Sequence, residues 1–266
     1  MSGNSAFELV SERSWRRGLS NLLDNEFAGW WKTRMWWIQC LIWVGLIGFI
    51  IGAALFGSPG EHPRLSDGLV LYAIIAGIFP AVGVVIIMQD ALVGDKKDGT
   101  AAWVMSKPAT RQAFIFSKLI ANSLGILATM VMIPAIVVYG MILIGVKANP
   151  DPWLFLQACG LIFLSLLFYL TLTLMLGTFF KSRGPVIGIT MAIMFLQQYM
   201  IALLPALRYV LPWTLFVDLS KPSVRAIVPA ILMGQPVYSY IPIICLAVES
   251  ILFTLIALWR FNREEF

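Results

Sequence analysis

The sequence predicts an all-α integral membrane protein with six transmembrane helices, an N-terminal amphipathic interfacial helix and short re-entrant helices before the last span. The prediction rests on an apolar composition, on six long apolar segments and on a one-sided distribution of basic residues. Hydrophobic residues make up 59% of the chain, charged residues make up 12%, and the mean hydropathy is +0.85. A soluble domain carries about 25% charged residues. The net charge of +5 therefore does not indicate a soluble nucleic-acid-binding protein.

The six apolar segments set the predicted spans. A helix needs about 20 apolar residues to cross the hydrocarbon core of a bilayer. The segments that reach this length cover residues 36–56, 69–89, 113–146, 153–180, 185–204 and 240–259. Pro134 falls within the third segment and is expected to kink it. The chain thus divides into a tail with the interfacial helix (1–35), a six-helix membrane domain (36–260) and a short C-terminal tail (261–266).

Two amphipathic or broken stretches flank these spans. From Trp15 to Trp31 apolar residues recur at helical spacing, and basic and polar residues take the other face. A basic, Trp-rich amphipathic helix is typical of the membrane interface, whereas a soluble helix packed on a partner is the alternative. Residues 205–239 are apolar but contain five prolines. Irregular backbone is not tolerated against lipid, so we expect one or two short helices there, dipping into the outer leaflet and packed against the bundle.

The basic residues outside the spans predict the orientation. With the N-terminus inside, 14 of the 19 Lys and Arg residues fall on the inner side and 5 on the outer side. Cytoplasmic loops carry the excess of Lys and Arg. Both termini, and the connection between the second and third spans, are therefore predicted to be cytoplasmic.

Signatures of an enzyme or a metal centre do not occur in this sequence. His62 is the single histidine, and the three cysteines lie inside apolar runs without C-x-x-C spacing. Residues 94–99 have the G-x-x-x-x-G spacing of a phosphate-binding loop, but Thr100 and Ala101 follow where the motif needs Lys and then Ser or Thr. The chain is therefore not expected to hydrolyse ATP or to bind a metal by itself.

Polar residues inside the spans are candidates for function. Glu249 lies midway along the sixth span, where a carboxylate costs about 2.5–3.5 kcal/mol on insertion scales. It is expected to face a translocation path or a dimer seam, or else to form a hydrogen bond that locks two helices. Gln197 and Gln198 are adjacent in the fifth span and cannot both face one neighbour. We expect one of them to pair with Glu249.

The polar stretch 90–112 between the second and third spans is the other candidate site. Gly99 is expected to break the chain, Thr100 to cap a short helix over 101–106, and Thr110 to cap the next helix. The short helix carries Trp103 between two groups of charged residues. These are Asp95, Lys96, Lys97 and Asp98 on one side, and Lys107 and Arg111 on the other. An exposed Trp among charges is typical of a protein-docking patch; a helix lying on lipid headgroups is the alternative.

At these residues the sequence resembles the type-2 permeases of ATP-binding-cassette (ABC) transporters. That family has six spans, an amphipathic N-terminal helix and, after the second span, an acidic-Lys-x-x-Gly-Thr stretch followed by Ser-x-Pro, Arg and Lys. The matching residues here are Asp95, Lys96, Gly99, Thr100, Ser106, Pro108, Arg111 and Lys118. The family usually has Glu at the first of these positions, so Asp95 keeps the charge with a shorter reach.

The resemblance implies a permease subunit, and an exporter, in the plasma (inner) membrane of a prokaryote. It implies that two permease copies or paralogues pair, and that each docks a separate ABC ATPase subunit through the 90–112 stretch and the N-terminal helix. ATP and Mg would then bind on the partner subunit and no cofactor on this chain. Two other functions are compatible with the residues: an ion- or proton-coupled secondary transporter or channel that uses Glu249, and a membrane scaffold without transport. The transported substrate is not predicted.

Overall fold

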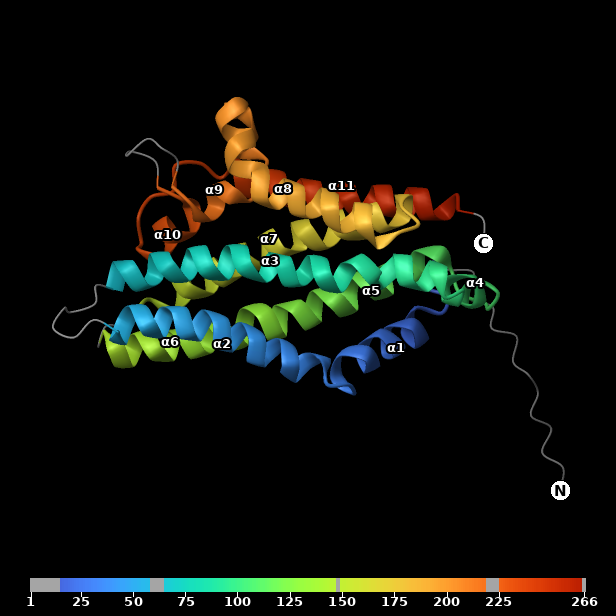
Figure 1. The fold of residues 1–266 in the computed structure, drawn as a ribbon, viewed down its shortest axis with the longest axis horizontal. Helices are drawn as coiled ribbons and strands as arrows, with labels where there is room; N and C mark the ends of the chain where they lie inside the picture. The colour runs from blue at the N-terminus through green and yellow to red at the C-terminus, as the bar shows by residue number, and fades with distance from the viewer. Residues whose placement is uncertain (1–14, 58–64, 147–148, 219–224, 265–266) are drawn as a thin grey trace, which may run out of the picture.

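The structure is a computed structural model that describes residues 15–57, 65–146, 149–218 and 225–264. Every regular element in these residues is helical, and most helices run along the long axis of the molecule (Figure 1). The elements are α1 (Leu19–Trp31), α2 (Met35–Phe56), α3 (Leu65–Lys97), α4 (Thr100–Met105), α5 (Arg111–Ile126), the π-helix η1 (Leu127–Met132), α6 (Ile133–Gly145), α7 (Pro152–Phe179), α8 (Arg183–Leu203), the 3-10 helix η2 (Pro205–Tyr209), α9 (Trp213–Phe216), α10 (Ile227–Leu232) and α11 (Ile241–Asn262).

Six helical segments of the described residues are long and apolar enough to cross a membrane, as the sequence predicted. They are α2, α3, the continuous run α5–η1–α6, α7, α8 and α11. Helix α7 lies at the centre and packs most extensively against α3 and α11. Buried residues occur along most of the length of α7. By contrast, α2, α8 and α11 each expose many apolar side chains at the surface. The structure confirms the fold class.

The second span extends beyond its predicted end. Residues 90–97 were expected to be part of a loop, but α3 continues through them and ends at Lys97. Ala91 is half-buried, and Leu92 and Val93 are buried against the bundle, so this polar stretch still has an apolar face that keeps it helical. The polar connection to α5 is therefore reduced to α4 and the few residues around it.

The helix boundaries beside α4 correct one prediction and confirm another. Thr100 is the first residue of α4 rather than its cap, and Gly99 takes the cap position with φ 72° and no side-chain hydrogen bond. Glycine adopts this left-handed conformation without strain. Thr110 caps α5 as predicted, because its hydroxyl oxygen accepts a hydrogen bond from the Ala113 N–H at 3.1 Å.

The third span contains an irregular turn next to Pro134, where a kink was expected. Residues 127–132 form a π-helix, and α6 begins immediately afterwards with Pro134 in its first turn. Proline has no backbone N–H to donate to the preceding turn. The helix accommodates it with wider turns instead of breaking.

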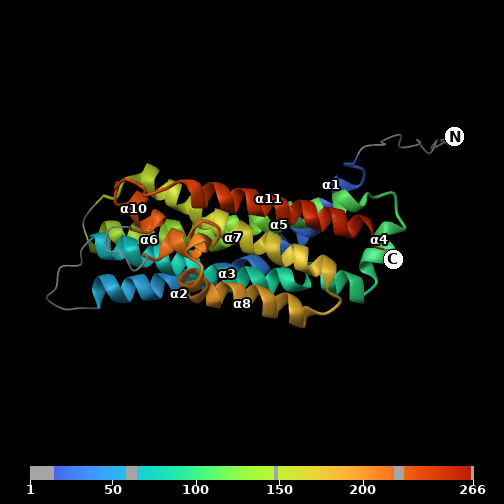
Figure 2. The ribbon, with the colours of Figure 1, turned by 90° about the horizontal axis from the view of Figure 1, so that it is seen from above.

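The described part of the proline-rich stretch before the last span forms three short helices, where one or two were expected. Helix α10 packs against α7 and α3, and η2 and α9 lie against α8 and α11. These elements gather at the end of the bundle opposite α4 in two views (Figures 1 and 2). They therefore cover the bundle at that end.

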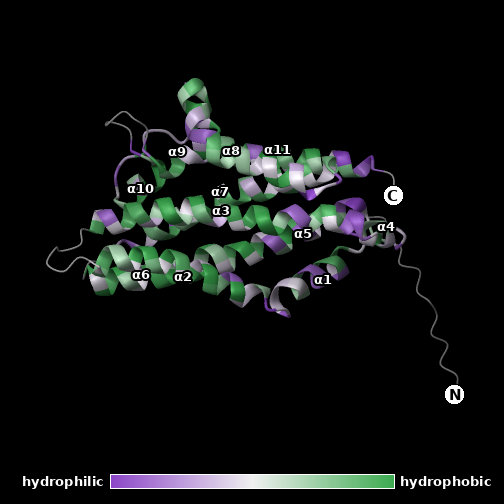
Figure 3. Ribbon diagram, viewed as in Figure 1, coloured by the Kyte–Doolittle hydropathy of each residue, from purple (hydrophilic) through white to green (hydrophobic). Residues whose placement is uncertain are grey.

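The end of the bundle formed by α4, the start of α5 and the C-terminal ends of α3, α7 and α11 is called the basic end here. Hydrophilic residues gather there and around α1, while the middle of the long helices is apolar (Figure 3). Among the described Lys and Arg residues, only Arg208, in η2, and Arg225, just before α10, lie toward the opposite end. The structure thus places the described inner-side cations at the basic end, beside α1 and at its connection to α2, while Arg13 lies outside the described residues.

Candidate functional site

Helix α4 forms an exposed tip at the basic end. Its buried residues, Ala101 and Val104, face the bundle and pack it against α3. Trp103 points away, with 64% of its surface exposed, and the Lys107 ammonium lies 5.2 Å from the centre of its ring. A large aromatic side chain exposed beside a cation is a typical anchor for a protein partner.

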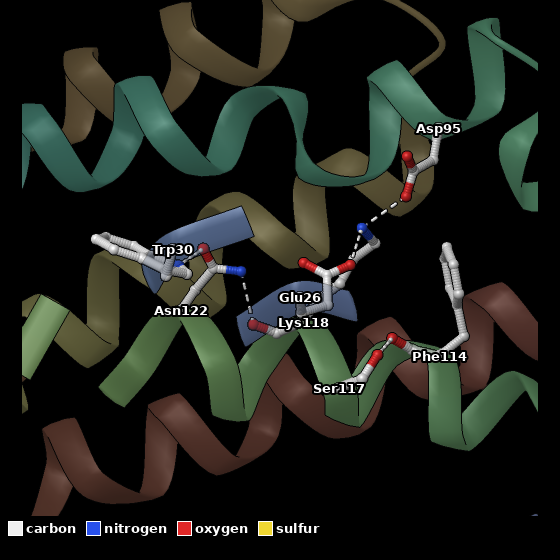
Figure 4. Close-up of polar contacts among 7 residues, drawn as sticks. All are labelled: Glu26, Trp30, Asp95, Phe114, Ser117, Lys118 and Asn122. Carbon is white, nitrogen blue, oxygen red and sulfur yellow. Dashed lines mark hydrogen bonds and ion pairs between the residues drawn. The ribbon is translucent and has the colours of Figure 1, made fainter. Parts of the chain in front are cut away.

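A buried lysine joins three helices directly behind this tip (Figure 4). The Lys118 ammonium on α5 lies 2.8 Å from the Glu26 carboxylate of α1 and 2.6 Å from the Asp95 carboxylate of α3. Only 6% of the Lys118 side chain is exposed, against 23% for Glu26 and 25% for Asp95. A buried charge is tolerated when partners of opposite sign surround it. Lys118 has two, and they link α1 and α3 through α5.

Trp30 and Asn122 attach α1 to α5 one turn further along. The indole N–H of Trp30 donates to the Asn122 side-chain oxygen at 3.0 Å, and the Asn122 amide donates to the Lys118 carbonyl at 2.7 Å (Figure 4). Gly125 makes room for the indole, because a Cβ at that position would lie 2.4 Å from the Trp30 ring. Trp30 is 4% exposed, so α1 is firmly packed on α5 as well as amphipathic.

Two further cations tie the ends of α7 and α11 to the helices that flank α4. The Lys96 ammonium donates to the carbonyls of Gly177 and Thr178 at 3.1 and 3.0 Å and pairs with Glu264 at 2.8 Å. Arg111 donates to the carbonyls of Phe261, at 3.3 Å, and Asn262. The last carbonyls of a helix lack intrahelical partners and carry partial negative charge. Both cations therefore bind helix C-termini.

The residues predicted to dock a partner separate into two groups. Asp98, Gly99, Thr100 and Trp103 are exposed at the tip. Asp95, Lys96 and Arg111 are instead bound to other helices of this chain. The sequence reasoning missed Glu26, Asn122 and Glu264. A signal for Glu26 existed, because a lysine within an apolar helix needs a carboxylate, but the sequence does not say which one.

The expected pair of Gln197 or Gln198 with Glu249 is not formed among the described residues. Gln197 is 2% exposed, donates to the Tyr169 hydroxyl at 3.0 Å and accepts from the Trp213 N–H at 3.1 Å. It thus joins α8 to α7 and to the start of α9. Glu249 is half-buried, and its Oε2 atom is buried without a hydrogen-bond partner among the described residues. The prediction was wrong for Gln197 because its side chain is already satisfied by Tyr169 of α7 and by the start of α9.

Together these features define a multi-pass membrane protein with an exposed short helix braced at its basic end. The family model described as ABC-2 family transporter protein matches residues 10–266. The chain therefore belongs to the ABC-2 transporter family, as its resemblance to type-2 permeases indicated, and is the membrane permease subunit of an ABC transporter. None of the curated proteins compared with this chain matches it. Membership of the family implies an ABC ATPase subunit as partner.

Proposed function

We propose that the basic end receives the ATPase subunit and that α4 is the helix it contacts. The observation that carries the proposal is Trp103, which is exposed on a helix whose opposite face is buried. Asp98 and Lys107 flank it with exposed charges of both signs. Such a patch offers a partner both an apolar anchor and electrostatic complementarity.

The contacts behind α4 support a route by which a movement at the tip reaches the membrane helices. Asp95 and Lys96 lie in the last turn of α3, directly before α4, and Arg111 begins α5 after it. Asp95 is linked to α1 through Lys118 and Glu26. Lys96 binds the C-terminal carbonyls of α7, and Arg111 binds those of α11. A shift of α4 would therefore move α1, α3, α5, α7 and α11 together rather than one loop.

The complete proposal is an alternating-access exporter in a prokaryotic plasma membrane. Two permease copies or paralogues pair, both termini are cytoplasmic, and ATP and Mg bind on the partner subunits and not on this chain. ATP binding favours one arrangement of the ATPase pair and so shifts the permease pair between two states. The collection of basic residues at the end with α1 and α4 supports this orientation.

The test uses the purified complex of permease and ATPase in nanodiscs. Trp103→Ala and Asp98→Lys should each lower the permease-stimulated ATPase rate, and Trp103→Ala should weaken binding of the ATPase by about 2 kcal/mol, as for an aromatic interface anchor. Charge reversal at Asp95 should lower stimulation too. Because it also breaks the ion pair with Lys118, its effect does not distinguish lost docking from a disturbed fold.

A matched control is Trp153→Ala at the opposite end, because Trp153 is 65% exposed and Trp103 64%. It should leave stimulation unchanged. If the Trp103 and Asp98 variants keep full stimulation and binding, α4 does not dock the ATPase.

The unpartnered carboxylate of Glu249 favours a second candidate function, ion- or proton-coupled transport without an ATPase. An unpaired ionisable side chain inside a span is a functional candidate by default. This function predicts transport by the chain alone in liposomes with an ion gradient, and its loss in Glu249→Gln. Glu249 also fits the first proposal, as part of the translocation path or dimer seam. In that case Glu249→Gln lowers transport by the complex while assembly is preserved.

A further inference from the structure

A long groove lies on the membrane-facing side of the bundle between α5, α7 and α11. Its volume is about 610 Å³, within the range of roughly 300–1,000 Å³ that ligand sites have. The side chains that line it are Phe116, Leu119, Ile120, Ser123, Leu124, Leu127, Phe163, Leu167, Thr171, Ser250, Ile251, Thr254, Leu255 and Leu258. Leu124 is 46% exposed and Ile251 60%, so the groove is open at its side. Neither the docking tip nor Glu249 belongs to it.

The groove is chemically apolar along its length. Four hydroxyl side chains line it, but Thr171, Ser250 and Thr254 each donate to carbonyls of their own helix. These three hydroxyl protons are therefore already donated to backbone carbonyls and are not available to a ligand. A ligand with many polar groups would lose its hydrogen bonds to water here without replacement.

The dimensions of the groove match one leaflet of a bilayer. From Phe116 on α5 to Leu127, the first residue of η1, the span advances about 16 Å at 1.5 Å per residue. This is close to half of the hydrocarbon core, which is about 30 Å thick. At the basic end, Arg111 and the stacked rings of Phe114 and Phe261, 5.4 Å apart, hold α5 against α11.

The basic end of the groove carries an aromatic and cationic rim. The Trp15 ring lies 5.4 Å from the Phe116 ring, which lines the groove. The Arg16 guanidinium lies 5.2 Å from the Trp15 ring, and both Trp15 and Arg16 are exposed. Trp side chains favour the headgroup level of a membrane, and each cation near the surface attracts anionic lipids.

From this arrangement we propose that the groove binds an acyl chain of an anionic phospholipid, with the headgroup beside Arg16. The apolar wall, the one-leaflet length and the cation at one end each match one part of that molecule. A second copy of the chain centred on the groove fits less well, because a two-fold axis there would set the groove against an identical groove. Two concave surfaces leave a void, and voids are rare in packed interfaces. The groove contains no residue of α4, so the proposal does not rest on ATPase docking.

The experiment places the whole chain in nanodiscs that contain a phosphatidylglycerol probe with a photoreactive diazirine in one acyl chain. After irradiation, mass spectrometry locates the labelled residues. We expect labels concentrated on the groove faces of α5 and α11. Labels spread evenly over the exposed faces of α2, α8 and α11 would overturn the site, as would cross-links joining two grooves in place of lipid labels.

Two pairs of variants sharpen this result. Leu124→Trp fills the groove and should lower labelling several-fold, whereas Ile144→Trp on α6, where the native side chain is 75% exposed outside the groove, should not. Arg16→Gln should lower labelling about fivefold, the factor expected for losing one cation at an anionic surface. Arg34→Gln, which removes another exposed arginine, should leave labelling unchanged.

Equal labelling in Leu124→Trp and wild type would overturn the acyl-chain site. Equal effects of the two arginine variants, or equal labelling by a phosphatidylcholine probe, would overturn headgroup recognition by Arg16. The label map of the wild-type chain decides the site even if a variant fails to fold.

Discussion

Two ionisable residues within the apolar helices, Lys118 and Glu249, have opposite surroundings. Lys118 on α5 has a carboxylate from α1 and another from α3 within 2.8 Å. Glu249 on α11 has one buried oxygen without any hydrogen-bond partner among the described residues. The first is a charge that the fold has compensated, and the second is a charge that the single chain leaves uncompensated.

This difference separates structural from functional charges. Insertion of either residue is costly, so each must have a reason to persist. For Lys118 the reason is visible, because its partners join three helices behind the docking tip. For Glu249 the fold supplies no such reason, which directs attention to another copy, a cargo or an ion. Variants that break the ion pairs of Lys118, and a variant that removes the charge of Glu249, test this contrast.

The largest loss of stability is expected when Lys118, the compensated charge, is replaced. Lys118→Met leaves Glu26 and Asp95 facing each other without a cation, and breaking a buried ion pair costs about 3–5 kcal/mol. The melting temperature of the purified chain in detergent should fall accordingly. Adding Glu26→Gln and Asp95→Asn to Lys118→Met removes the stranded charges and should recover most of the loss. If the single and triple variants melt together, the cluster does not hold the helices.

An intermediate loss of stability is expected at the hydrogen-bonded pair of Trp30 and Asn122, which lies beside Lys118. Asn122→Leu leaves the indole N–H of Trp30 buried without an acceptor, and an unsatisfied buried donor costs about 1–3 kcal/mol. The double variant Trp30→Phe/Asn122→Leu removes both groups and should be more stable than Asn122→Leu alone. Thermal melts of the wild type, the single variants and the double variant measure these differences. The less stable a variant is, the more sensitive its α1 helix should be to protease. Additive losses would contradict the hydrogen bond.

The smallest effect on stability is expected at Glu249. Glu249→Gln removes a charge that has no partner to lose, so the free energy of unfolding should change by no more than about 0.5 kcal/mol, or rise. The same melts provide the measurement. A loss comparable to that of Lys118→Met would mean that Glu249 is compensated within the chain, and the contrast would disappear.

The fold was predictable from the sequence to the extent that the bilayer dictates it. The length and hydropathy of each span follow from the thickness of the hydrocarbon core, so the predicted spans lie close to the observed helices. The end of α3 was not predictable in this way, because residues 90–97 are polar enough to resemble a loop. Their helical state depends on burial of Leu92 and Val93 against other helices.

The candidate site was predictable only in its local part. Gly99, Trp103 and Thr110 were identified because breaks, exposed aromatics and caps are signals within a few residues. The partners of Lys118 were not, since Glu26 is 92 residues away and the ion pair exists only after the helices have packed. The same limit explains Gln197, whose partners Tyr169 and Trp213 lie on two other helices.

The π-helix in the third span has a consequence for how sequence changes would act there. Wider turns accommodate extra residues, and removing one residue from 127–132 would favour an ordinary α-helix. Each residue of an α-helix turns the chain by about 100°. Such a deletion would remove the extra residue and keep α6 facing α2 as it does now, whereas straightening the segment without a deletion would rotate α6 by about 100° against α5 and present new side chains to α2, which packs on both η1 and α6. Residues 127–132 thus set the rotational phase between the two halves of one span.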